Sequence, residues 1–325
     1  MKRSTIGVII GAAVAMVLAA VALPFLGLAI FFRQEIKDWV GLVDRTKGAR
    51  LVYEMQPAAP DEALPGAEQV CKSILRRTDP DGRWGVEVAL RGERQVEVAV
   101  FGPPERVERV KRLLSQVGRL EFRILADKIK DRDKANVDRL VRLKEEGQPP
   151  DSARWRWCVL KKGREWQEAN LLDAMGLVYV ADEQGRKVEV LVDMGDGQNV
   201  TGQDLASAKV TLSDGEPAIA FNLKPEASTR FSRLTSPENR ERHLGIILDG
   251  VIQAAPMLMA TLSTGGIIDG YKTRQELQDV VSILNSGELG CRLGDPVHEE
   301  WFGPGRPQGS DGPDGGIVPS PARGR

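Results

Sequence analysis

The chain has 325 residues, which is enough for two or three domains and a substantial buried core. Lys and Arg number 45 against 46 for Asp and Glu, so the formal net charge is -1 and no long-range field favours a polyanion such as nucleic acid. Three cysteines, Cys71, Cys158 and Cys291, lie far apart with no CxxC and no histidine at ligand spacing, which argues against a zinc site or a disulfide framework. We expect all three cysteines to be small, buried apolar side chains.

A long apolar run opens the chain. Residues 6–32 contain no charged residue, His, Asn or Gln, and they follow Lys2 and Arg3. Because about 20 apolar residues span a bilayer, we predict a transmembrane anchor at 6–32 and a short cytoplasmic N-terminus at 1–5. A cleavable signal peptide is the alternative, since Ala20-Val21-Ala22 has the small-x-small pattern, but the apolar run continues past it.

The order β-α-β-β-α-β is predicted between residues 45 and 126. Apolar residues alternate with polar ones on both sides of a short turn, which predicts a hairpin with one buried face. Helical spacing follows Asp61 and the pair Pro103-Pro104. This order is typical of a ferredoxin-like lobe. Its predicted strands lie at 51–53, 86–90, 96–100 and 120–125.

A charged helical connector is predicted at 127–155, where the apolar stripe is narrow. Strands are predicted at 177–181 and 187–192, but the pattern of 151–199 as a whole predicts no fold. From residue 204 strand and helix signals return, and we predict a second α+β lobe over 156–295 with a mostly antiparallel sheet. In residues 303–325 Gly and Pro make up 12 of 23 residues, which predicts a disordered tail.

The stretch from His243 to Gly290 carries the clearest local signals. An apolar run leads into Asp249 and Gly250, which supply the positive φ angles of a two-residue turn, so a hairpin is predicted. A helix follows, with Thr273 as N-cap, Glu276 placed to reach back to the cap, and Gly287 at the end. Asp249 is therefore interpreted as a turn residue and not as a catalytic carboxylate.

This stretch resembles a known family. The segments LGIILDGVIQAAP and GGIIDGYKTRQELQDVVSILNSGEL are similar to the end of the first large extracytoplasmic domain of SecD, the accessory subunit of bacterial protein export. RTKGARLVYEM and VKRLLSQVGRLEFRIL resemble the beginning of that domain, and VTGQDLASAKV resembles its middle. The resemblance covers about residues 48–289, with a weakly matching interval at 127–199.

The resemblance implies a role in protein export. SecD proteins bind preproteins that emerge from the translocon outside the cytoplasm, and they use the proton gradient. We therefore expect a single-pass protein of the bacterial inner membrane whose large portion is extracytoplasmic and binds unfolded or translocating polypeptide. Its partners would be translocon subunits or SecD/SecF-like membrane subunits. The alternative is a structural or interaction module of another envelope complex that reuses the same fold.

Energy coupling is expected to come from elsewhere. The family's proton pathway uses ionisable residues inside membrane helices that follow the domain, whereas here Gly290 leads to Cys291, Arg292 and a polar tail. Since a titratable group inside the membrane couples a proton to movement, we expect this chain not to be proton-driven by itself.

Enzymatic chemistry is not indicated. The two histidines, His243 and His298, have no nucleophile elbow beside them, and the pair Gly265-Gly266 lacks the lysine of a phosphate loop. The segment from Asp193 to Asn199 has a faint likeness to a calcium loop but misses its alternate-residue spacing and its bidentate glutamate. We predict no catalytic, cofactor-binding or metal-binding residue, and no cofactor.

The segment from Pro256 to Leu262 is the best candidate for polypeptide contact. In an extended conformation Met257 and Met259 face one way, while Leu258 and Leu262 face the other. One side would belong to the core and the other would be exposed, and flexible thioethers suit a surface that accepts many sequences. A fully buried strand is the alternative interpretation.

Overall fold

The structure is a computed structural model, and it describes residues 43–130, 134–150, 152–161, 169–182, 184, 186–195, 197–213, 215–268 and 273–303. The predicted N-terminus at 1–5 and anchor at 6–32 lie outside these residues, as does the predicted tail beyond Gly303. Of the helices in the described ranges, none has both the length and the apolar composition needed to cross a bilayer.

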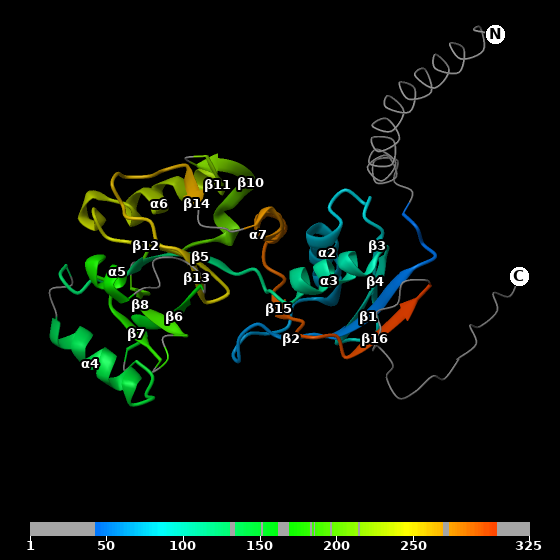
Figure 1. Cartoon of the computed structure of the whole chain (residues 1–325), viewed down its shortest axis with the longest axis horizontal. Coiled ribbons are helices and arrows are strands. Elements are labelled where there is room, and N and C mark those ends of the chain that lie inside the picture. Colours follow the sequence, from blue (N-terminus) through cyan, green and yellow to red (C-terminus); the bar gives the residue numbers. More distant parts are fainter. Residues whose placement is uncertain are drawn as a thin grey trace, which may run out of the picture.

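The chain forms two lobes (Figure 1). The first lobe has a four-stranded sheet of order β16-β1-β4-β3, with two helices on one face. Apolar side chains alternate along its strands as predicted, so that Val96, Val98 and Val100 are buried under the helices. The elements are β1 (Gly48–Glu54), α2 (Ala67–Thr78), β3 (Val86–Leu90), β4 (Gln95–Phe101), α3 (Pro104–Leu114) and β16 (His298–Phe302).

The fourth strand of this sheet is not the predicted one. The strand predicted at 120–125 exists as β5 (Leu120–Leu125), but it belongs to the second lobe. Its place beside β1 is taken by β16, which pairs antiparallel with β1 from Gly48 opposite Phe302 to Val52 opposite His298. The predicted ferredoxin-like lobe at 45–126 is wrong in this respect. The physical reason is that all six residues of β5 are buried, which suits a strand covered on both faces.

Two smaller corrections concern the same lobe. Helix α2 begins after Gly66 and not at Asp61, because Pro65 disfavours helical backbone at the residue before it. Two short strands, β2 (Gln56–Pro57) and β15 (Cys291–Arg292), pair antiparallel, so the segment after α7 packs on the first lobe. The second lobe therefore does not extend to residue 295.

The second lobe contains a sheet of order β7-β8-β6-β13-β12-β5-β9. A further pairing of β8 with β5 closes it into a ring, and only the β13–β6 pairing is parallel. The strands predicted at 177–181 and 187–192 are confirmed in it. Besides β5, its strands are β6 (Trp155–Leu160), β7 (Tyr179–Ala181), β8 (Val188–Asp193), β9 (Val200–Thr201), β12 (Leu244–Leu248) and β13 (Val251–Ala254).

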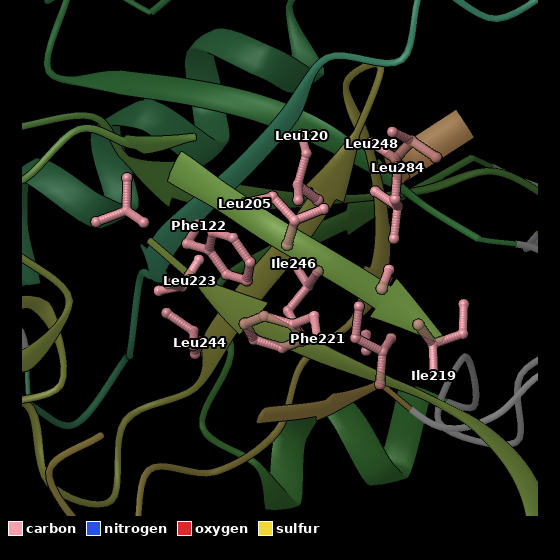
Figure 2. Packing of buried hydrophobic residues seen from close by; sticks show 14 of the residues in the cluster. Leu120, Phe122, Leu205, Ile219, Phe221, Leu223, Leu244, Ile246, Leu248 and Leu284 are labelled. Carbon is pink, nitrogen blue, oxygen red and sulfur yellow. The ribbon is translucent and has the colours of Figure 1, made fainter. Parts of the chain in front are cut away.

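A second layer packs on this ring. It contains a three-stranded sheet of order β10-β11-β14 and the helices α6 and α7. Figure 2 shows the core between the layers, where Phe122 of β5 lies 5.1 Å from Phe221 of β11 between ring centroids. Its elements are β10 (Leu205–Ser213), β11 (Glu216–Leu223), α6 (Ser228–Leu234), β14 (Gly265–Ile268) and α7 (Arg274–Ser286), with short 3-10 turns at Gly202–Asp204, Pro225–Ala227 and Pro237–Asn239.

The predicted connector at 127–155 is part of the second lobe. Its helix α4 (Lys134–Glu145) packs Val137 and Leu140 against Leu191 of β8 and Val178, which precedes β7. A short helix, α5 (Ala169–Ala174), packs Leu172 into a separate cluster with Val190 and Val192, which face the other side of β8 from Leu191. The narrow apolar stripe is therefore a packing face, and the chain crosses between the lobes in the short segment between α3 and β5.

Arg77 seals the junction where the lobes meet. It projects from α2, is fully buried, and donates hydrogen bonds to Val117 O at 2.9 Å, Gly287 O at 2.6 Å and the Ser286 hydroxyl at 3.0 Å. Leu113 O and Gln116 O also accept from it. Leu113 O lies in the last turn of α3 and Gly287 O at the C-cap of α7, where a cation is favoured by the helix dipoles, and Gln116 O and Val117 O follow α3. Burial nevertheless lowers the pKa of Arg77 to about 10.

Asp249 completes the junction from the hairpin turn. Asp249 and Gly250 have φ angles of 51° and 78°, so the predicted two-residue turn is confirmed. The Asp249 carboxylate also accepts hydrogen bonds from Gly118 N and Arg119 N at 2.9 and 2.8 Å. The turn residue thus holds the backbone that crosses between the lobes. Arg119 adds ion pairs with Glu62 at 2.7 Å and Glu288 at 2.8 Å.

Candidate polypeptide-binding surface

The segment that carries Met257 is held in an extended conformation. After β13 the chain runs back beside the strand that leads into β12. Leu244 N donates to Pro256 O at 2.9 Å, Leu258 N donates to Arg242 O at 2.8 Å, and an isolated bridge joins His243 to Met257. These bonds fix the alternation of side chains to the two faces.

The two faces differ as predicted. Leu258 is 3% exposed and belongs to the core between the two layers, and Leu262 packs against that core. Met257 is 47% exposed and Met259 is 65% exposed. The alternative of a fully buried strand is wrong, because the segment lies at the margin of the core and joins its neighbour through an isolated bridge and not through a full sheet.

Ile129 is an exposed apolar residue that the sequence pattern did not single out. It is 84% exposed, in a turn where the Asp127 carboxylate accepts from Ile129 N at 2.8 Å and Lys130 N at 2.9 Å. Lys130 Nζ then donates to Arg240 O and to Glu241 at 3.0 and 2.9 Å, which attaches the turn to the segment that precedes β12. The only signal in the sequence was one isoleucine among charged residues.

We call Ile129, Met257 and Met259 the methionine surface. Its border is charged: Arg240 donates to Met259 O at 3.3 Å, and Lys130 forms an ion pair with Glu241 at 2.9 Å. Apolar side chains bordered by charged groups are typical of a protein interaction site. The thioethers are adaptable, so such a site does not require one fixed ligand sequence.

His243 lies directly beneath this surface. Its side chain is buried, and its Nδ1 atom has no hydrogen-bond partner among the described residues. Burial lowers the pKa of His243 below its usual 6.5, while the nearby Asp127 carboxylate acts in the opposite direction. His243 is therefore a neutral core residue at neutral pH, and an isolated backbone bridge joins it to Met257.

The remaining predicted positions have structural roles. Thr273 caps α7 by accepting from Glu276 N at 3.1 Å, and Gly287 ends the helix with a φ of 74°. The carboxylate of Glu276 pairs with Lys161 at the end of β6. His298 lies in β16, and Gly265 and Gly266 begin β14.

Neither a metal site nor a reactive thiol is indicated in the described ranges. Asp193 pairs with Arg154 at 2.9 Å and accepts from Gly195 N, and no cluster of His, Cys, Asp or Glu there could hold a metal ion. The cysteines are free. Cys158 and Cys291 are buried as expected, and burial raises the pKa of Cys291 to about 11, but Cys71 is only half-buried.

The sequence of the second lobe matches a described protein family. Residues 177–291 match the family model "SecDF, P1 head subdomain". The chain is 26% identical over 295 residues to protein translocase subunit SecD of Rhodothermus marinus, a match that covers 73% of this chain and 47% of that protein. It is 40% identical over 91 residues to SecD of Aquifex aeolicus, covering 28% and 18%. The chain spans about half or less of the curated relatives that it matches.

Solved structures share the fold. A crystal structure of SecDF in a super-membrane-facing form aligns with a TM-score of 0.53 at 20% identity, over 79% of this chain and 30% of that chain. A structure described as a membrane component SecDF that enhances protein export aligns with a TM-score of 0.50 at 21% identity, over 76% and 97%.

Proposed function

Because the chain carries a P1 domain of the SecD and SecDF family, we propose that it assists protein export by binding translocating polypeptide on the extracytoplasmic side of the membrane. The role is binding and not catalysis. The partners in this proposal are the unfolded polypeptide and the membrane subunits of the translocon or of a SecD/SecF-like complex. The predicted anchor at 6–32 would hold the domain at the bacterial inner membrane.

The methionine surface is the observation that carries the proposal. Met257 and Met259 expose apolar area on a segment whose other face is fixed in the core, and Ile129 exposes apolar area on a separate turn. An exported polypeptide presents apolar side chains before it folds, and each methyl or methylene group buried against the surface contributes about 0.8 kcal/mol. Adaptable thioethers let one surface accept many such sequences.

A paired substitution tests this role. The double variant Met257→Ser with Met259→Ser should bind a reduced, carboxymethylated protein about tenfold more weakly than the parent, because two apolar contacts are lost. The matched control is Leu90→Ser with Val297→Ser, which removes two half-exposed apolar side chains from the first lobe. Binding is measured by fluorescence anisotropy with the full chain in mild detergent. Equal affinity of the double variant and the parent would contradict the proposal.

Crosslinking separates export from the alternative role. A photoreactive residue at Ile129 should crosslink to a stalled secretory precursor or to translocon subunits in membranes. Exclusive crosslinking to another envelope assembly would instead support the structural module. The hypothesis that the chain is not proton-driven by itself has its own test: vesicles that hold only this protein should show no polypeptide movement when a proton gradient is imposed.

A further inference from the structure

A strand edge is open in the second layer of the second lobe. The order β10-β11-β14 makes β10 an outer strand, and Figure 1 shows it on the side of the lobe that carries α7. An outer strand has backbone N–H and C=O groups that no neighbouring strand satisfies. Such an edge can accept another extended chain.

The register shows which residues of β10 direct these groups outward. The hairpin closes on Ser213 opposite Glu216, and the closing pair of a two-residue hairpin exchanges hydrogen bonds. Bonded and non-bonded pairs alternate along the strands, so Leu212 and Val210 belong to non-bonded pairs and their backbone groups point away from β11. Pro217 lies opposite Leu212 and has no N–H to donate, which agrees with this assignment.

Asn285 of α7 already pairs with this edge. Its carboxamide accepts from Ala208 N at 2.8 Å and donates to Ala208 O at 2.9 Å. Ala208 precedes Val210 in the same outward-facing series. A carboxamide offers the donor and acceptor of a peptide group, so Asn285 occupies the first position of an added strand. Asn285 pairs with Ala208 alone. Within the described ranges no group outside the sheet pairs with the backbone of Val210 or Leu212.

The side chains at these positions are apolar and exposed. Val210 is 42% exposed and Leu212 is 67% exposed, although natural edges are usually protected by charge, proline or a covering element. Val210 lies opposite the buried Ile219, so its face continues the core of the lobe outward. A strand added at this edge would gain both backbone hydrogen bonds and apolar contact.

We infer that the edge of β10 from Val210 to Leu212 binds an extended segment of unfolded polypeptide by β-strand addition. The inference rests on the proposed function and names a second contact with the same ligand. Recognition would be through the main chain and therefore tolerant of sequence, with a preference for apolar residues at alternate positions and against proline.

A polypeptide segment fits this edge better than a second copy of the chain. The open ladder offers the backbone groups of two residues and two apolar side chains, which is far less than the roughly 1,000 Å² that a stable protein interface buries. A short ladder can still hold a segment that is bound elsewhere as well, since a linked second contact benefits from effective concentration. The methionine surface would be that other contact.

The test separates main chain from side chain at one position. Val210→Pro removes the outward N–H without breaking a bond to β11, whereas Val210→Thr keeps the N–H and the branched shape. With reduced, carboxymethylated protein as the probe, we expect Val210→Pro to weaken binding about fivefold and Val210→Thr less than twofold. In the parent, hydrogen exchange at the Val210 and Leu212 amides should slow when the probe binds.

The outcomes are distinct. If the parent and Val210→Pro bind the probe equally and the two amides stay unprotected, the inference is wrong while the proposed function stands. If the parent does not bind the probe, both are wrong. Protection that grows with protein concentration in the absence of probe would assign the edge to a second copy and would also overturn the inference. Circular dichroism of Val210→Pro confirms that the variant is folded.

Discussion

Two regions differ in where their side chains find partners: the junction between the lobes, and the methionine surface. At the junction a fully buried guanidinium, Arg77, donates to carbonyls just beyond the ends of α3 and α7, and the Asp249 carboxylate accepts from the backbone between α3 and β5. At the methionine surface Met257 and Met259 remain in water. The junction has its partners within the chain, so it is a structural feature. The surface has apolar area left over, so it is available for a ligand.

The same comparison assigns different energies to the two regions. A buried charge whose hydrogen bonds are all made is costly to disturb, because its removal leaves several carbonyl groups without partners. An exposed thioether contributes little to folding, because it has not left water. Substitutions at the junction should therefore change stability, and substitutions at the surface should change binding alone.

The largest expected effect is at Arg77. Arg77→Met fills much of the same volume but leaves Val117 O, Gly287 O and other carbonyls of two helix ends buried without a donor. We expect the free energy of unfolding to fall by about 3–5 kcal/mol, measured by urea denaturation. Arg76→Met is the matched control, since Arg76 is exposed on the same helix and should change stability by less than about 0.5 kcal/mol. Similar small losses in both variants would show that the junction is not a stabilising element.

Asp249 should give the next largest effect. Asp249→Ala removes the acceptor for Gly118 N and Arg119 N and places alanine at a φ of 51°. Each change costs about 1 kcal/mol or more, so a loss of about 2–3 kcal/mol is expected. Asp249→Asn keeps one acceptor oxygen and tolerates the backbone conformation, and should lose about half as much. Equal losses in the two variants would show that neither the oxygen kept in asparagine nor its tolerance of positive φ contributes to stability.

His243 connects the methionine surface to pH. Its pKa in the folded chain is lowered by burial, so between that value and the usual 6.5 the unfolded chain binds a proton that the folded chain does not. The free energy of unfolding should therefore decrease as the pH falls below 6.5. Above pH 6.5 His243 is neutral in both states, so it should add no pH dependence. Asp127 and Lys130 are the charged groups that face it.

The measurement compares His243→Gln with the parent in urea at pH 7.5 and pH 5.5. The parent should lose more stability than the variant on acidification, because glutamine does not titrate. His298→Gln, at an exposed position of β16, should behave like the parent. A parent and a His243→Gln variant that lose stability equally would show that the buried histidine is not linked to folding.

Local signals predicted the elements well, and pairing between distant segments was harder to foresee. The Asp249-Gly250 turn, the Thr273 cap and the alternation at Met257 to Leu262 follow from residues within a few positions of one another, and the structure confirms them. The exchange of β5 for β16 does not follow from local pattern. The sequence pattern of a strand does not say which sheet the strand joins. Glu300 of β16 lies 250 residues from its partner Arg50 of β1.

The candidate site shows the same division. The sequence predicted which side chains of the methionine segment face the core, because alternation along a strand is a property of the backbone. Ile129 was not, since its exposure depends on a turn held by Asp127 and on the contact of Lys130 with Arg240. Arg77 was also not singled out. A charged residue on a helix usually faces water, and only the meeting of three helices makes it a buried cap.

The smallest expected effect on stability sharpens the comparison within three consecutive residues. Met257→Ser and Met259→Ser should each change the free energy of unfolding by less than about 0.5 kcal/mol, because Met257 is 47% and Met259 65% exposed to water. Leu258→Ala, between them, should cost about 2–4 kcal/mol, because it opens a cavity in the core. Urea denaturation of the three single variants measures the difference. If the methionine variants were destabilised as strongly as Leu258→Ala, the methionines would be core residues, and a weakened binding of polypeptide could no longer be attributed to a lost contact.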